Sequence, residues 1–175
     1  MRAHPLGPSH PAVFLLCSSA ESAELAGQAG VGMIFSEFIA HREGGDAVAA
    51  YRKAFRPSPF QAEPWAGVAV HALAAPTAEE AKRLDAPRRA SQLVMGMGQQ
   101  RRFTDIAEAE AFLAGLAGDP RLAALEARSI ASDPATVRQQ LAKKAADAGA
   151  DEVFILATGP SLDVRLMSLE LIKQG

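Results

Sequence analysis

VFLLCSSAES, at Val13–Ser22, is an apolar run of strand length that ends in hydroxyl groups and then turns into a helix. The run up to Cys17 predicts a buried strand, and the alanine-rich residues from 20 to 29 predict the helix after it. A helix N-terminus offers unpaired N–H groups and a partial positive charge, and the turn after a strand is where an α/β protein usually holds a phosphate. Ser18, Ser19 and Ser22, which we call the serine turn, therefore form a candidate anion site. The alternative is that Ser19 or Ser22 only caps its own helix.

Composition limits the class of protein. The chain has 175 residues, so we expect one domain over residues 1–175. The formal net charge is −2 and the basic residues are spread along the chain, which argues against a nucleic-acid partner. The lone Cys17 excludes an intrachain disulfide framework and fits a reducing compartment. No signal peptide and no run of membrane-spanning length is visible, so the sequence predicts a cytoplasmic protein without a membrane partner.

Apolar runs and helix signals alternate along most of the chain. Because two strands joined by a helix of about ten residues make a βαβ unit, whose strands pair in parallel, the first two strands predict a parallel sheet. Gly30 and Gly149 are placed to end the helices before them. We expect Leu25 on the inner face of the first helix. The predicted strands are 12–17, 31–36, 65–73 and 152–157, and the predicted helices are 20–29, 46–55, 78–84, 134–148 and 163–173.

Two stretches depart from this alternation. Residues 85–128 predict a helical insertion after the third strand, with helices at 105–116 and 120–127 and with Arg88 and Arg89 in a solvated loop. Such an insertion is usually a lid or an interface element. Residues 1–11 read as an extended lead-in that contains His4 and His10. Since no carboxylate accompanies these histidines, we predict no metal site.

Three groups of segments resemble the bacterial luciferase-like family of flavin-dependent monooxygenases, and they occur in the family's order. No single segment is specific, but the ordered set covers nearly the whole chain. The first group is Leu15–Ser19 with Ser22 and Glu24–Ala26. The second is Tyr51–Ser58, Glu63–Trp65, Val68–Val70 and Ala74–Ala81. The third is Asp133–Val137 and Gly149–Glu152, with Asp163 and Arg165-Leu166.

The resemblance implies a partial TIM barrel. The family has a full barrel, and this chain looks like its C-terminal half, with four βα units that correspond to strands five to eight. Met1-Arg2-Ala3 already resembles the family's linker before strand five. We therefore expect a start codon assigned inside the gene, a natural truncation or a split gene.

The same resemblance suggests the site. Ser18, Ser19 and Ser22 match the family's phosphate-contacting residues after strand five, which implies FMN as the cofactor. Cys17 replaces the usual glycine there, Glu37-Phe38 stand where many relatives have histidines, and Ala131 replaces another glycine. Cys17, Glu37 and His71 are candidate pocket residues. No nucleophile and base can be paired from the sequence, so no catalytic residue is assigned.

Two functions follow as alternatives. The first is an oxidoreductase that uses reduced FMN and O2 on a small organic substrate, with a flavin reductase as partner. The second is a non-catalytic module that binds flavin or another phosphate ligand, or that serves in assembly. Half of a barrel exposes unpaired strand edges, so we expect a homodimer. A separate N-terminal-half chain is the other partner that could cover them.

Overall fold

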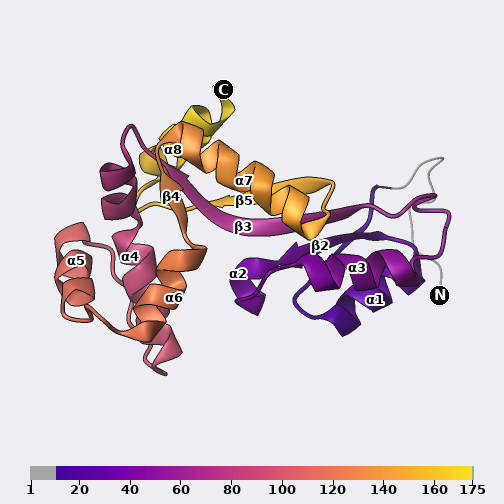
Figure 1. The fold of residues 1–175 in the computed structure, drawn as a ribbon, viewed down its shortest axis with the longest axis horizontal. Helices are drawn as coiled ribbons and strands as arrows, with labels where there is room; N and C mark the ends of the chain where they lie inside the picture. Colours follow the sequence, from indigo (N-terminus) through magenta and orange to yellow (C-terminus); the bar gives the residue numbers. More distant parts are fainter. Residues whose placement is uncertain (1–10, 175) are drawn as a thin grey trace. The chain divides into compact units, whose positions relative to one another are not determined.

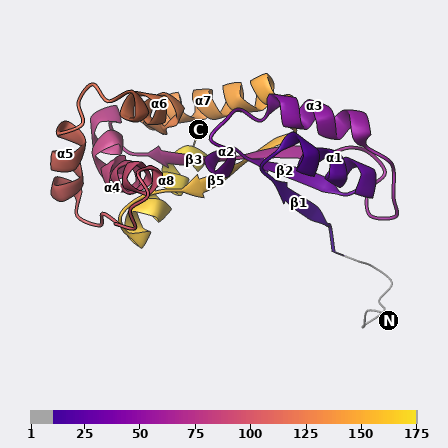
Figure 2. The same cartoon turned by 90° about the horizontal axis from the view of Figure 1, so that it is seen from below.

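A computed structural model describes residues 11–174, so the predicted lead-in with His4 and His10 lies outside the described residues except for Pro11. Over residues 11–174 the chain forms five strands and eight helices (Figures 1 and 2). The strands are β1 (Phe14–Cys17), β2 (Gly32–Ser36), β3 (Ala66–Ala74), β4 (Ile130–Ser132) and β5 (Glu152–Ala157). The helices are α1 (Ala20–Ala29), α2 (Glu37–Ala40), α3 (Gly45–Ala54), α4 (Ala78–Gly96), α5 (Ile106–Ala114), α6 (Pro120–Arg128), α7 (Pro134–Ala148) and α8 (Leu162–Lys173).

The strands form one parallel sheet, which confirms the predicted α/β class. Their order is β1-β2-β3-β4, and β5 also pairs with β3. In the parallel register, Leu16 lies beside Ile34, and Ile34 beside Gly67. The sequence predicted four strands and missed β4, because three residues between two helices are too few to show a period of two. The correspondence to barrel strands five to eight stays a prediction.

Contacts divide the chain into two compact units. The first contains the residues up to Val70 together with Lys144–Phe154, and the second contains His71–Lys143 and the residues from Ile155 on. The single domain expected from the length of the chain stays a prediction.

In the first unit, α1 and α3 lie side by side (Figures 1 and 2) and pack on one face of the sheet. Their small residues allow the close approach, and the Tyr51 hydroxyl donates to the Val31 carbonyl at 2.9 Å and accepts from the Trp65 N–H at 3.1 Å. The prediction for Leu25 was wrong, because its side chain is 61 % exposed. The buried side of α1 is instead made by Ala23, Ala26 and Gly27.

Gly27 marks the closest contact between α1 and α3. A Cβ at this position would lie 2.6 Å from the carbonyl oxygen of Tyr51. We expect Gly27→Ala to lower the free energy of unfolding by about 1–3 kcal/mol, the usual cost of overpacking. Gly96→Ala is the matched control, since a Cβ at Gly96 meets nothing within 4 Å and alanine favours a helix by at most about 1 kcal/mol. Urea denaturation followed by circular dichroism measures both, and equal effects of the two substitutions would contradict the close approach.

In the second unit, α4 is longer than predicted. We expected a helix that ends at Leu84, but α4 continues through Pro87 to Gly96. Proline removes one backbone hydrogen bond and usually breaks a helix. Here Ala90, Leu93 and Val94, which follow it on α4, are buried in a core shared with α5 and α6, so tertiary packing offsets the loss. The two later helices of the predicted insertion are α5 and α6.

Candidate functional site

The serine turn is the N-terminus of α1. Ser19 is the N-cap: its hydroxyl accepts from the Ser22 N–H at 3.2 Å, and the Ser22 hydroxyl accepts from the Ser19 N–H at 3.2 Å. The Ser22 hydroxyl also donates to the Ser19 carbonyl at 2.9 Å. These bonds form a reciprocal capping box. Ser19 and Ser22 therefore cap their own helix, whereas Ser18 is exposed and takes no part in the capping box. The anion site at this turn stays a prediction.

Glu21 places a carboxylate at the same helix end, a feature that the sequence analysis did not use. Its own backbone N–H, and then the Ser19 hydroxyl, hold the pKa of Glu21 below its usual range, and the Arg42 guanidinium adds a smaller attraction. The N-terminus of α1 thus already attracts a negative charge, that of the Glu21 carboxylate. A phosphate bound at this turn would have to compete with that carboxylate.

Arg42 is the cation on this side of the first unit. It follows α2, is exposed, and its guanidinium carbon lies 5.8 Å from the centre of the Phe35 ring on β2. The Arg42 charge is also the smallest of the causes that lower the pKa of Glu21. The sequence analysis did not single out Arg42.

Cys17 is a buried thiol beside the turn. Burial raises its pKa, and the hydrogen bond with Ser22 only partly opposes this shift. The thiol lies 3.7 Å from the Leu15 carbonyl as a weak donor. A protonated, buried thiol is a poor nucleophile, so Cys17 lines the base of the turn as a small apolar residue.

Glu37 follows β2, but its carboxylate is bound by the chain itself. One oxygen accepts from the Gly44 N–H at 2.9 Å, and the other lies 2.9 Å from the Lys144 ammonium group. Lys144 also pairs with Glu43. Burial lowers the pKa of Lys144, but its hydrogen bonds with Glu43 and Glu37 outweigh this, and the net shift is upward. Glu37 therefore holds the loop after α2 in place.

Ser36 is a buried hydroxyl that the sequence analysis did not single out. It ends β2 beside Ala69 of β3 and is fully buried. Within residues 11–174, its Oγ finds no hydrogen-bond partner. The only signal in the sequence was its place at the carboxyl end of a predicted strand, where ligand-binding residues of α/β proteins gather.

The remaining candidate, His71, lies half-buried on β3 in the second unit. The first unit thus brings together Cys17 and the serine turn, whereas His71 belongs to the other unit. Within residues 11–174, no group of three or more His, Cys, Asp or Glu side chains is arranged to hold a metal ion. In the same range, no helix combines the length and apolar character needed to cross a membrane.

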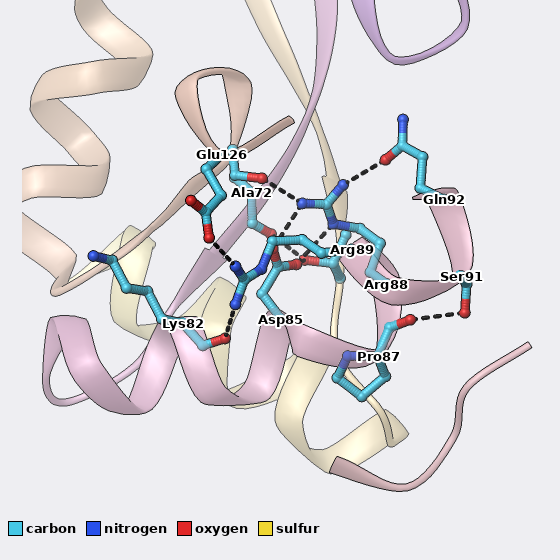
Figure 3. A network of polar contacts seen from close by, with 11 residues as sticks. Ala72, Lys82, Asp85, Pro87, Arg88, Arg89, Ser91, Gln92 and Glu126 are labelled. Atoms are coloured by element: carbon cyan, nitrogen blue, oxygen red, sulfur yellow. Dashed lines mark hydrogen bonds and ion pairs between the residues drawn. The ribbon is translucent and has the colours of Figure 1, made fainter. Parts of the chain in front are cut away.

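The second unit contains a buried ionic network around Asp85 (Figure 3). Both Asp85 oxygens accept from Arg88, at 2.7 and 2.6 Å, and Thr158 lies 3.3 Å from one of them. Arg89 pairs with Glu126 at 2.7 Å and lies 3.6 Å from Asp85. The expectation that Arg88 and Arg89 lie in a solvated loop was wrong, because α4 continues through them and turns both toward acidic partners.

Comparisons with known proteins support the resemblance at the level of fold. No family model matches the chain. An uncharacterised Bacillus subtilis (strain 168) protein, YceB, is 28 % identical over 99 % of this chain and 53 % of its own length. The structure of apo-MsnO8 superposes with a TM-score of 0.82 at 30 % identity, over 96 % of this chain and 51 % of that one.

A third match is to a monooxygenase solved with FMN. The oxygenating constituent of 3,6-diketocamphane monooxygenase from Pseudomonas putida, a Type II Baeyer-Villiger monooxygenase solved in complex with FMN, superposes with a TM-score of 0.54. It is 20 % identical over 93 % of this chain and 46 % of that one, and this likeness shows the fold alone. The chain spans about half the length of each of these relatives. Its solved structural neighbours thus include a flavin-binding monooxygenase.

Proposed function

We propose that this chain is a luciferase-like flavin protein whose serine turn binds the phosphate of FMN. The observation that carries the proposal is the β1–turn–α1 geometry, in a chain that superposes on apo-MsnO8 over nearly all of its length. A helix N-terminus at the carboxyl end of a parallel strand provides N–H donors and a partial positive charge.

The residues at the turn fit a phosphate. The exposed Ser18 hydroxyl donates to a phosphate oxygen, and an N–H group at the start of α1 that the capping box does not use binds the same group. Ser19 and Ser22 act indirectly, because their hydroxyls hold the backbone of the turn in the capping box. Cys17 keeps the floor of the turn apolar. Reduced FMN, when bound, supplies the chemistry that activates O2 for transfer to a small organic substrate.

Ligand titration tests the phosphate proposal. We expect FMN to raise the melting temperature, inorganic phosphate to compete with it, and riboflavin, which lacks the phosphate, to bind much more weakly. The absence of any thermal or absorbance change with millimolar FMN would refute the site. With binding established, oxygen uptake coupled to a flavin reductase separates the enzyme from a flavin-binding module, because only the enzyme consumes O2 faster than the reductase alone.

A second candidate function is a non-catalytic binding or assembly module. The observation that favours it is β1, which ends the strand order and leaves Phe14, Leu15 and Leu16 exposed. Under this proposal a homodimer, or a separate chain that corresponds to the N-terminal half of the family's fold, covers the exposed apolar residues. We also propose a cytoplasmic location, because a single unpaired cysteine fits a reducing compartment.

The Glu21 carboxylate should weaken the binding of phosphate at the serine turn, because it places a negative charge at the same helix end. We expect Glu21→Gln to strengthen phosphate and FMN binding by roughly 5-fold, because it removes an exposed negative charge worth about 1 kcal/mol beside the ligand. Glu24→Gln on the next turn of α1 is the matched control and should change affinity little. Isothermal titration calorimetry at low salt measures both. Weaker binding by Glu21→Gln would show that the phosphate lies elsewhere.

A further inference from the structure

Helix α8 of the second unit carries apolar residues on two sides. On its inner side, Val164 and Met167 pack against the core cluster of Leu73, Ala81 and Leu84. The buried Ser168 hydroxyl accepts from the Ala74 N–H at 2.8 Å. Arg138 of α7 adds a bond to the carbonyl of Leu171 at 3.0 Å. These contacts fix the rotation of α8 about its axis, so the direction of its outer side is determined.

The outer side is a stripe of three leucines, which we call the α8 stripe. Leu162, Leu166 and Leu169 are 60 %, 50 % and 40 % exposed. Their spacing of four and then three residues puts all three on one line along the helix, the d-a-d sequence of a heptad. Scattered exposed leucines are common, but an aligned stripe of them marks an interaction site.

Charges beside the stripe indicate what covers it. Arg165 and Glu170 are both exposed and lie on opposite flanks, at the g and e positions of the same heptad. In a parallel pair of helices, a g residue faces the e residue five positions later on the other helix. Arg165 of each copy then meets Glu170 of the other, twice by symmetry. An antiparallel pair would bring like flanks together, arginine beside arginine.

We propose that the α8 stripe is a homodimer interface, in which α8 packs in parallel against α8 of a second copy of this chain. The inference rests on the homodimer offered above as part of the proposed function, and it is independent of flavin binding. The apolar stripe is short, because the next a position is the charged Lys173. An isolated helix with so short a stripe would not dimerise stably, but α8 is already anchored to its own unit. The contact is isologous, and it therefore closes at two copies.

Light scattering of the full chain over a dilution series tests the interface. We expect a dimer for the wild type, a monomer for Leu166→Glu, and a dimer for Leu25→Glu, a control at an equally exposed leucine on α1. Melting curves check that each variant folds. A folded Leu166→Glu that remains dimeric overturns this interface but leaves a homodimer formed elsewhere. A monomeric wild type overturns the homodimer altogether, and FMN binding still decides the serine turn separately.

Charge reversal and cross-linking test the parallel register. Arg165→Glu alone and Glu170→Arg alone should each weaken the dimer at low salt, and the double variant should restore it. Leu162→Cys and Leu166→Cys should each form a disulfide with the same position of the second copy, as only a parallel pair brings both positions together. Failure of the double variant to restore the dimer, or cross-linking at only one of the two cysteines, overturns the parallel arrangement.

Discussion

Asp85→Asn lowers the free energy of unfolding more than any other single substitution that we predict for the second unit. The carboxylate is 2 % exposed and receives two bonds from Arg88, whose side chain is 17 % exposed. Asparagine has nearly the same shape but leaves that half-buried guanidinium without a counter-charge. Breaking one partner of a buried ion pair costs about 3–5 kcal/mol, and the residual exposure of Arg88 places this case toward the lower end.

Urea denaturation monitored by circular dichroism and by fluorescence measures this loss. Glu108→Gln is the matched control, since its pair with Arg101 is about half exposed on both sides and should contribute at most about 1 kcal/mol. Arg88→Met provides a second approach, because it leaves Asp85 with only the more distant Arg89, 3.6 Å away, as a counter-charge. Equal effects of Asp85→Asn and Glu108→Gln would show that the network of Figure 3 does not hold α4 in place.

Ser19→Asp abolishes phosphate binding at the turn without unfolding α1. Aspartate caps a helix as well as serine does, and its charge favours the helix N-terminus, so stability should be preserved. The same charge lies beside the bound phosphate. At an effective dielectric constant for a protein surface, two charges about 4 Å apart repel by about 4 kcal/mol, which corresponds to roughly a 1,000-fold loss of affinity.

The neutral variant Ser19→Asn separates charge from geometry, because asparagine is an equally good N-cap. We expect Ser19→Asn to keep most of the affinity for FMN, and both variants to melt within a few degrees of the wild type. Calorimetry with FMN and with inorganic phosphate gives the two affinities. Unaltered affinity of Ser19→Asp would remove the serine turn from the proposed site.

Helix and strand boundaries show how far local sequence signals extend. Helix α1 ends at Gly30, which takes the left-handed conformation, and α7 starts at Pro134, both as predicted. The strand predicted at 152–157 is β5. Each of these signals acts within a few residues: a cap, a fixed φ, or an apolar run. They hold regardless of what packs against them.

The candidate site was predictable only in part. The serine turn could be found because strand, hydroxyls and helix are contiguous. The buried Ser36 hydroxyl could not, since its burial depends on what packs around the end of β2. Glu37 was expected in the pocket, yet it binds Gly44 and Lys144, a partner 107 positions away. A carboxylate's partner is set by distance in space, which no local pattern encodes.

The sequence by itself determined the α/β class, the start and end of α1, and the hydroxyls at its N-terminus, because these depend on backbone preferences over a few neighbouring residues. Tertiary structure alone decided that α4 continues through Pro87, that Leu25 faces solvent, and that the half-buried Arg88 pairs with Asp85. It also decided that the α8 stripe points outward. Burial and ion pairing are properties of surroundings, and these surroundings come from residues far apart in the chain.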